Sequence, residues 1–258
     1  MEHDHTLLLQ RRDVAGLLSI GECMDAVERA LCLHAEGKAM PPGVLGLHAC
    51  DGGFHIKAGI LGLNRSYFAA KVNANFPCNF QKHGLPTIQG VIILFDATDG
   101  RCLAIMDSIE ITIIRTGAAT GVAAKYLAPF SASVASICGC GNQGKISLKA
   151  LLQVRKLEKI YAFDIDDKQS HKFKEEFCRQ LEIIPIAKHD LSAALMESHI
   201  VITCTPSKEP YIRADDILLG TFIAAVGADS EDKQELFSEL LSKSKVVVDI
   251  AEQSASIV

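Results

Sequence analysis

The sequence predicts an α/β protein, in which a Rossmann-type doubly wound parallel sheet follows a β-rich N-terminal domain. Three observations predict this class. Short apolar runs alternate with helical segments from residue 134 onward, a G-x-G-x-x-G turn opens the first helix of that series, and β-type runs dominate before residue 117. The length of 258 residues accommodates two modest domains. We place them at residues 1–117 and 118–258.

The N-terminal domain is predicted to contain a long helix and several short strands. Apolar residues recur with helical spacing from Ser19 to Gly37, and glycine is a typical helix stop. An Asp-Gly turn at residues 99–100 indicates a hairpin. A helix rich in alanine and glycine runs from Thr116 to Leu127 and ends before Pro129. The predicted strands are residues 54–59, 67–73, 91–96 and 102–106.

The C-terminal domain is predicted to alternate strands with helices. This alternation is typical of a parallel sheet that carries helices on both faces. The expected strands are residues 134–138, 160–164, 183–186, 200–203, 221–226 and 246–250. The expected helices are residues 143–154, 168–181, 191–197 and 233–242.

The motif that carries most information is the glycine turn after the strand at 134–138, formed by Gly139, Gly141 and Gly144. The first glycine adopts the angles of a tight turn, the second leaves room for a pyrophosphate, and the third lets the next helix pack close to its strand. That helix presents its free N–H groups and positive dipole end to the phosphates. The layout therefore predicts dinucleotide binding.

Asp164 ends the following strand, about 25 residues beyond Gly139. A carboxylate at this position accepts hydrogen bonds from the ribose hydroxyls and repels a 2′-phosphate, so the motif favours NAD over NADP. Taken alone, the turn is also compatible with a flavodoxin-like protein or with a glycine turn that binds nothing.

Composition excludes several other classes of protein. The formal net charge is −5 and no basic run occurs, so we expect no nucleic-acid partner. No apolar run approaches the roughly 20 residues of a membrane helix, so we expect no membrane partner. The nine cysteines lack disulfide-framework or metal-ligand spacing. Together with the absence of a signal peptide, this predicts a protein of the reducing cytoplasm without a metal site.

Three cations in the N-terminal part are candidates for binding an anionic ligand. Lys57 and Lys71 each lie inside an apolar strand pattern, where a lysine either points into water or holds a substrate carboxylate. Arg115 directly precedes the predicted helix at 116–127. The helix dipole disfavours a cation at that end, which favours an anionic ligand over a salt bridge.

Two further strand ends carry polar residues in the C-terminal part. Ligands of doubly wound sheets bind at the carboxyl ends of the strands. We therefore expect the residues that follow two of these strands to line the cofactor, namely Thr203, Thr205, Val226 and Gly227. Asp229 is either a helix cap or a general base that faces the nicotinamide, and Lys233 follows it by four positions.

Four segments, in the same order, resemble the ornithine cyclodeaminase/mu-crystallin family: residues 71–100, 104–128, 138–144 and 224–236. The resemblance covers nearly the whole chain. It implies a substrate-binding and dimerisation domain followed by an NAD-binding Rossmann domain, and it implies a homodimer.

The resemblance also implies roles for single residues. Lys71 matches the lysine that contacts the substrate, Arg115 the arginine near the substrate carboxylate and the cofactor, and Asp229 the catalytic aspartate of the cyclodeaminases. The residues that match cofactor contacts are Thr87, Asn142, Gln143 and Asp164, and Lys233 matches the lysine that follows the catalytic aspartate.

The chain departs from the family pattern in two ways. An arginine that grips the substrate carboxylate in cyclodeaminases aligns with Gly43, and we hypothesise that Lys57 takes over its role. The family also continues beyond a point matching Val258, with a segment that carries an F-D-S-x-G motif. We therefore expect part of the nicotinamide and substrate pocket to be missing from this chain.

The resemblance implies an NAD-dependent enzyme that converts L-ornithine to L-proline and ammonia. NAD takes a hydride from the α-carbon, the side-chain amine closes the ring, ammonia leaves and the hydride returns. Asp164 and the Asp229–Lys233 pair favour this cyclodeaminase reaction. The alternatives are an alanine dehydrogenase-like amino-acid dehydrogenase, a cyclic ketimine reductase, and a non-catalytic binding protein like mu-crystallin.

Overall fold

The computed structural model describes residues 5–40, 42–179, 181–230, 232–251 and 254. The chain divides into two compact units, Met1–Arg115 and Thr116–Val258. The division falls inside helix α4 (Ile109–Leu127), and the predicted boundary at residues 117 and 118 lies in the same helix. No helix among the described residues has both the length and the apolar character needed to cross a membrane.

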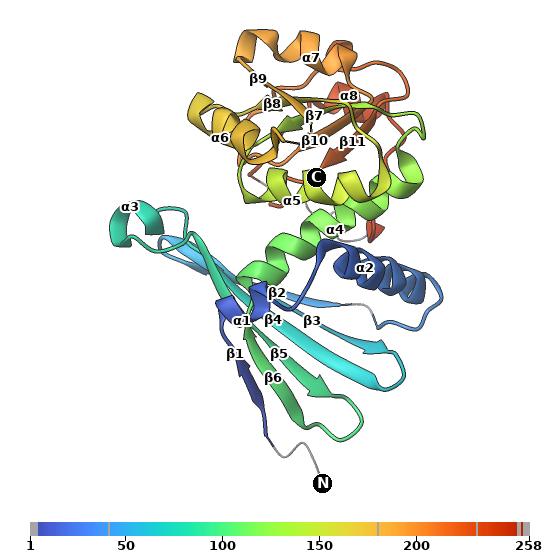
Figure 1. Ribbon diagram of the computed structural model, residues 1–258. Helices are drawn as coiled ribbons and strands as arrows, with labels where there is room; N and C mark the ends of the chain where they lie inside the picture. Colours follow the sequence, from blue (N-terminus) through green and yellow to red (C-terminus); the bar gives the residue numbers. More distant parts are fainter. Residues whose placement is uncertain (1–4, 41, 180, 231, 252–253, 255–258) are drawn as a thin grey trace. The chain divides into compact units, whose positions relative to one another are not determined.

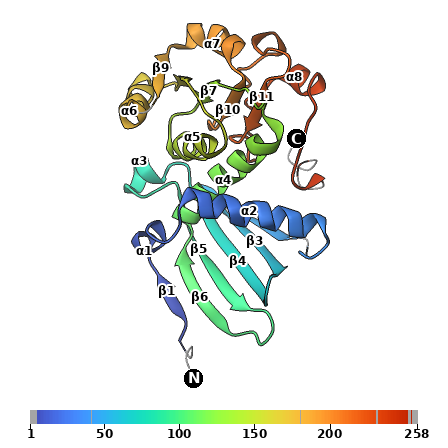
Figure 2. The ribbon, with the colours of Figure 1, turned by 45° about the vertical axis from the view of Figure 1, so that its right-hand side comes forward.

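Unit 1 is built on a six-stranded sheet with the order β1-β6-β5-β4-β3-β2 (Figures 1 and 2). Strands β2 to β6 form an antiparallel meander, and β1 pairs in parallel with β6 at the edge. The predicted hairpin is confirmed as β5 and β6, joined by a turn in which Gly100 has a φ of 77°. The strands are β1 (Leu7–Leu9), β2 (Gly43–Ala49), β3 (Gly52–Gly62), β4 (Ser66–Asn75), β5 (Ile88–Asp96) and β6 (Cys102–Asp107).

Helix α2 (Ile20–Ala35) confirms the predicted N-terminal helix. Its start is fixed by Ser19, whose side chain accepts a hydrogen bond from the Glu22 backbone while the Glu22 carboxylate accepts one from Ser19. After its end, Gly37 has a φ of 72° that a Cβ would resist. Two short helices, α1 (Arg11–Ala15) and α3 (Asn79–His83), complete unit 1 before α4.

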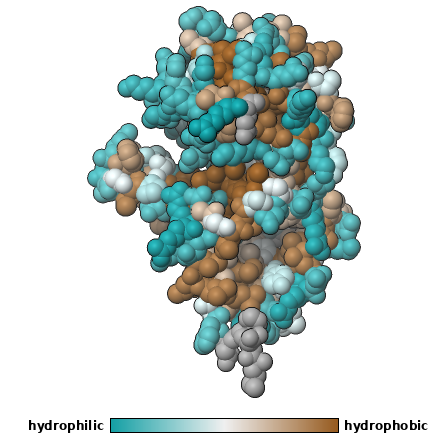
Figure 3. All heavy atoms as spheres, viewed as in Figure 1, coloured by the Kyte–Doolittle hydropathy of each residue, from teal (hydrophilic) through white to brown (hydrophobic). Residues whose placement is uncertain are grey.

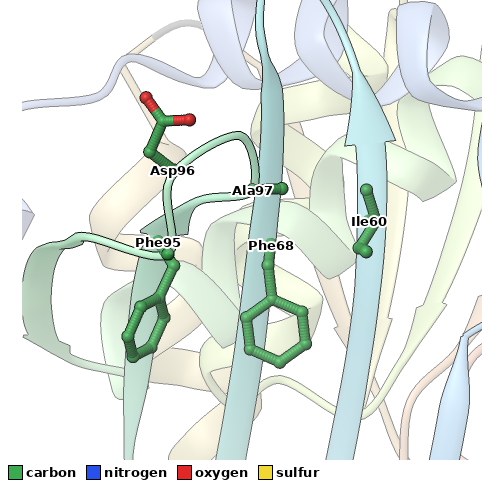
Figure 4. A pocket seen from close by; sticks show the side chains of 6 residues that line it. Ile60, Phe68, Phe95, Asp96 and Ala97 are labelled. Atoms are coloured by element: carbon green, nitrogen blue, oxygen red, sulfur yellow. The ribbon is translucent and has the colours of Figure 1, made fainter.

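Residues directly opposite each other in paired antiparallel strands share a face of the sheet. The two faces of the six-stranded sheet differ in chemistry. One face carries the opposed pair Lys57 and Lys71. The other face is apolar, and Figure 4 shows its Phe68 and Phe95 side by side with Asp96 pointing away. Two rows of opposed residues cross this apolar face: one consists of Leu45, Ile56, Val72 and Val91, and the other of Ile60, Phe68 and Phe95.

Unit 2 contains a five-stranded sheet in which every pair is parallel, in the order β11-β10-β7-β8-β9. This is the predicted doubly wound arrangement, because β7 lies at the centre and the chain winds outward from it in both directions. The strands are β7 (Val134–Cys138), β8 (Lys159–Phe163), β9 (Glu182–Ile186), β10 (Ile200–Thr203) and β11 (Phe222–Ala225). The helices are α5 (Asn142–Val154), α6 (Asp167–Phe177), α7 (Leu191–Glu197) and α8 (Ser238–Ser242), with 3₁₀ turns at Lys188–Asp190 and Ala214–Asp216.

Each face of this parallel sheet has its own apolar core. On one face, Ile137 and Ile160 pack with residues of α4, α5 and α6 such as Ala124, Leu148 and Phe173. On the other, Cys138 and Phe163 pack with residues that include Leu195 of α7 and Leu240 of α8. Burial on both faces explains why these strands are continuous apolar runs in the sequence.

Three predicted elements differ from the structure. The prediction that the helix before Pro129 starts at Thr116 is wrong: α4 starts at Ile109, whose N–H donates to the Asp107 carboxylate at 2.8 Å. The prediction of a helix from Lys233 is also wrong, because α8 starts only at Ser238. Residues 246–250 are not a strand, and their three valines are about half exposed.

Candidate functional site

Two positions of the glycine turn in unit 2 require glycine because a Cβ there would lie too close to backbone atoms of the chain itself. Gly139 has a φ of 101°, and a Cβ there would lie 2.9 Å from the Cys204 carbonyl oxygen. A Cβ on Gly144 would lie 2.0 Å from the Gly139 carbonyl oxygen. Gly141, by contrast, has nothing within 4 Å of its Cβ position. The backbone is therefore open at the second glycine, where a bound pyrophosphate needs room.

Helix α5 begins directly after this turn, with Gly141 as its N-cap and no acidic residue in its first turn. Its free N–H groups can bind an anion. Asn142 is exposed and Gln143 is half-buried. The Gln143 Oε1 and the Thr203 Oγ1 are buried and have no hydrogen-bond partner within the described residues, and each can serve a ligand.

Asp164 is tied to the glycine turn. Its Oδ2 accepts a hydrogen bond of 2.8 Å from the Cys140 N–H, and its Oδ1 accepts one of 3.0 Å from the Asp166 N–H. These bonds fix the carboxylate at the carboxyl end of β8, beside the turn, with further lone pairs available. The geometry fits a dinucleotide whose ribose hydroxyls donate to Asp164.

The cysteines around the turn are packing residues. Cys138 and Cys140 are fully buried, and the Cys204 thiol donates to the carbonyl oxygens of Cys138 and Gly139. Burial raises the pKa of all three thiols, that of Cys140 to about 12. Thiols with such pKa values are poor nucleophiles. Among the described residues, no cluster of three or more His, Cys, Asp or Glu side chains could hold a metal ion.

The ends of β10 and β11 are held together by a residue that the sequence did not single out, Glu235. Its side chain is almost fully buried. Oε1 accepts hydrogen bonds of 2.7 Å from both the N–H and the hydroxyl of Thr205, and of 3.1 Å from the Tyr211 hydroxyl. Oε2 accepts one of 2.9 Å from the Gly227 N–H. The only signal for Glu235 in the sequence was an acidic residue between Gln234 and Leu236, in the segment that follows the predicted strand at 221–226.

Asp229 and Lys233 form an ion pair, with Nζ and Oδ1 2.6 Å apart. The Asp229 side chain is 66% exposed and that of Lys233 22%. The alternative that Asp229 caps the next helix is wrong, because Phe237 is the N-cap of α8. Lys233 lies in the loop before that helix, and the pair lies in the segment that follows β11.

In unit 1, the charges of Lys57 and Arg115 lie close enough to act on the ammonium group of Lys71. Burial first, and then the charges of Arg115 and Lys57, together lower the pKa of Lys71 to about 8. Arg115 is exposed and lies in the second turn of α4, not at its start. The argument from the helix dipole for an anion at Arg115 is therefore wrong. The reason to expect an anion there is instead the proximity of three cations.

Thr87, the remaining predicted cofactor contact, belongs to unit 1. It is exposed in the loop between α3 and β5, where its carbonyl oxygen accepts a hydrogen bond from the Phe76 N–H. Residues Gly139, Gly141, Gly144, Asp164, Thr203, Thr205, Val226 and Gly227 all lie at the carboxyl edge of the parallel sheet, since each lies in or follows the end of β7, β8, β10 or β11.

The model of the ornithine cyclodeaminase/mu-crystallin family matches residues 4–257. The chain belongs to this family. It is 38% identical, over 96% of its length and 75% of the relative, to an alanine dehydrogenase from Archaeoglobus fulgidus.

Solved structures agree with this membership. An archaeal alanine dehydrogenase dimer with bound NAD has a TM-score of 0.91 and 37% identity, over 96% of this chain and 76% of that one. A Δ(1)-pyrroline-2-carboxylate reductase from Thermococcus litoralis, in complex with NADH and L-proline, has a TM-score of 0.83 and 35% identity, over 93% of this chain and 74% of that one. The family and the two-domain fold predicted from the sequence are confirmed.

Proposed function

We propose that this protein is an NAD-dependent oxidoreductase that interconverts an L-α-amino acid with its imino or 2-oxo acid. The observation that carries the proposal is the group of Lys57, Lys71 and Arg115 in unit 1, with Lys71 partly buried beside two other cations. Such a group suits a substrate carboxylate. The names of the two relatives, an alanine dehydrogenase and a pyrroline-2-carboxylate reductase, support chemistry at a carbon–nitrogen bond next to a carboxylate.

Unit 2 fits the cofactor. The open backbone at Gly141 and the free N–H groups of α5 suit the pyrophosphate, and the unpartnered Gln143 Oε1 and Thr203 Oγ1 supply acceptors. Asp164 suits the ribose of NAD and disfavours NADP. Bound NAD would supply a hydride acceptor for the α-carbon, and with the loss of one proton and the addition of water the amino acid would become the 2-oxo acid and ammonium.

The chain's own residues position the substrate and move protons. Lys71 and Arg115 hold the carboxylate and so fix the orientation of the α-carbon. Asp229 takes the proton from the amino nitrogen as a general base, and Lys233 orients its carboxylate through the 2.6 Å ion pair. Glu235 keeps the loops that carry Thr205 and Gly227 in place.

Turnover of amino acids by the purified chain tests this proposal. L-alanine, L-proline and L-ornithine are incubated separately with stoichiometric NAD or NADP, and NADH, ammonia and keto acid are measured. We expect NADH to accumulate with at least one amino acid, and NADP to be used far less well. Absence of redox turnover in either direction, with nucleotide binding retained, would contradict the proposal and leave a binding protein.

A second candidate is the cyclodeaminase reaction on ornithine. The observation that favours it is the Asp229–Lys233 pair, which the resemblance assigns to cyclodeaminases. In that reaction the hydride returns to the product. Ammonia and proline formed from L-ornithine with only trace NAD, and without net NADH, would establish this candidate in place of a dehydrogenase.

We also propose that the protein is a homodimer. The apolar face of the six-stranded sheet supports it, because Leu45 and Leu47 of β2 are 51% and 53% exposed there and Phe54 of β3 and Val91 of β5 are 40% and 41% exposed. Figure 3 shows apolar side chains at the surface of unit 1 on the side seen in Figure 1. Exposed apolar areas of this kind mark interfaces, and the archaeal alanine dehydrogenase is described as a dimer.

A further inference from the structure

Asn73 lies two residues after Lys71 in β4, so both side chains leave the same face of the six-stranded sheet. A rise of about 3.3 Å per strand residue places their Cα atoms about 6.5 Å apart. The flexible four-carbon stem of a lysine can cover such a distance. A small ligand that contacts the Lys71 ammonium group can therefore also contact the Asn73 amide.

The neighbour of Asn73 on β5 is Gly90, and the structure shows why a glycine is needed there. A Cβ on Gly90 would lie 2.5 Å from the Asn73 Oδ1 and 2.8 Å from the Ser108 Oγ. The space that a side chain of β5 would fill is thus taken by the Asn73 amide. This amide lies across β5 and reaches Ser108, the residue that directly precedes α4.

Ser108 holds the amide in one orientation. Ser108 is fully buried, and its hydroxyl donates a hydrogen bond of 2.8 Å to the Asn73 Oδ1. Its own N–H donates to the Gly90 carbonyl oxygen at 3.0 Å, which ties it to β5. Because the amide oxygen is bound by Ser108, the amide nitrogen is the end that faces away from it, and this nitrogen can only donate.

An amide donor beside an ammonium group suits an anion with several oxygen lone pairs. A carboxylate has about four such positions, so it can accept hydrogen bonds from Lys71 and Asn73 together. The ammonium form of an amino nitrogen carries only donors and matches neither group. A substrate bound here therefore directs its carboxylate to β4 and its nitrogen away from it.

We propose that Asn73 is a further substrate-binding residue, whose amide nitrogen donates a hydrogen bond to the carboxylate that Lys71 holds. Ser108 is the positioning residue that orients this amide. The inference rests on the proposed function, which assigns the substrate carboxylate to Lys71.

Binding of an unreactive acid tests the inference without turnover. Oxamate resembles a 2-oxo acid, and its affinity for the full chain with saturating NADH is measured by calorimetry. Asn73→Asp keeps the shape of the side chain but removes its donors, and should weaken oxamate binding at least tenfold. Asn73→Ala, the second variant should the first fold poorly, should weaken it at least fivefold. Propionate, which has the carboxylate alone, should lose affinity by the same factors.

A control and a double variant make the result specific. Asn64→Asp makes the same chemical change in the exposed turn between β3 and β4, and should leave oxamate affinity within twofold. Ser108→Ala should weaken oxamate about threefold in the unaltered chain and not at all in Asn73→Ala, since Ser108 acts through the amide. Additive losses from the two changes would indicate a merely structural role and overturn the inference.

Three further results overturn it as well: no binding of oxamate to the unaltered chain, unchanged affinity in both Asn73 variants, or weaker binding of oxamate with propionate unaffected. Turnover separates the inference from the proposed function. If an amino acid is oxidised and its KM is unchanged in Asn73→Asp, the inference fails and the proposed function stands. If oxamate binding depends on Asn73 and no amino acid is oxidised, the proposed function fails and the carboxylate site stands.

Discussion

The side-chain carboxylate of Glu235 accepts a hydrogen bond of 2.9 Å from the main-chain N–H of Gly227. Glu235 is buried, with 1% of its surface exposed. A Cβ on Gly227 would lie 2.5 Å from the Glu235 Oε2, so only glycine allows this approach. The other carboxylate oxygen binds Thr205. One buried acid thus fixes two loops at the carboxyl edge of the parallel sheet, where ligands of this fold bind.

We expect Glu235→Gln to weaken both stability and cofactor binding. The new amide places N–H donors against the N–H of Gly227 or of Thr205, so one buried donor loses its acceptor. The free energy of unfolding should fall by about 1–3 kcal/mol. Denaturant unfolding measures this, and fluorescence titration should show a raised Kd for NADH.

The matched control for this change is Glu239→Gln, which alters an exposed glutamate in α8 in the same chemical way. It should leave both quantities within error, since surface substitutions change stability by less than about 0.5 kcal/mol. A Glu235→Gln protein with unaltered NADH affinity would argue against a positioning role.

Two of the three glycines of the turn should separate stability from binding. In Gly144→Ala, the new Cβ meets the Gly139 carbonyl oxygen at 2.0 Å, and backbone cannot yield cheaply. We expect a loss of about 1–3 kcal/mol of stability. In Gly141→Ala, the Cβ meets nothing, so stability should change by less than about 1 kcal/mol.

NADH titration of the same two variants completes the comparison. Gly141→Ala should raise the Kd for NADH at least tenfold, because its methyl group takes the space that a pyrophosphate needs. A folded Gly141→Ala protein that binds NADH normally would mean that the turn does not hold the dinucleotide.

Most of unit 2 could be predicted because its signals are local. Strands such as Ile200–Thr203 are buried on both faces and therefore form apolar runs, and the glycine turn is set by backbone sterics within a few residues. The first turns of α4 could not, because Ile111, Ile113 and Ile114 are β-branched and suit a strand equally well. In the structure, the Asp107 carboxylate accepts a hydrogen bond from the Ile109 N–H at the start of the helix, a contact that the apolar pattern does not reveal.

The residues of the candidate site also fall into those that local sequence predicts and those that only the fold brings together. Motif residues such as Asp164 were found from spacing, and the structure joins Asp164 to the turn through Cys140. Glu235 was missed because two of its partners, Thr205 and Tyr211, lie 30 and 24 residues away and only the fold brings them together. The opposition of Lys57 and Lys71 is likewise a matter of strand register, which no single run of sequence contains.

The apolar face of the six-stranded sheet yields a prediction about assembly. Leu47 of β2 lies opposite Phe54 of β3 on this face. Leu47→Lys should convert the proposed homodimer to a monomer at micromolar concentration, because a buried unpaired charge is costly at an interface. Light scattering coupled to size exclusion measures the mass. Leu219→Lys, which changes a fully exposed leucine in unit 2, should leave the mass unchanged.

Lys71 yields the prediction about pH. Its pKa is lowered to about 8, chiefly by burial and then by Arg115 and Lys57, so its ammonium form exists below that pH and is lost above it. If the ammonium holds the substrate carboxylate, KM should be constant below pH 8 and rise up to tenfold for each pH unit above it. Lys71→Arg keeps its charge at high pH, so its KM should lose this rise even if its absolute value is higher. Steady-state kinetics from pH 6 to pH 10 on both proteins measure this. A rise in KM above pH 8 that is identical in Lys71→Arg would assign the titration to the substrate's amino group instead.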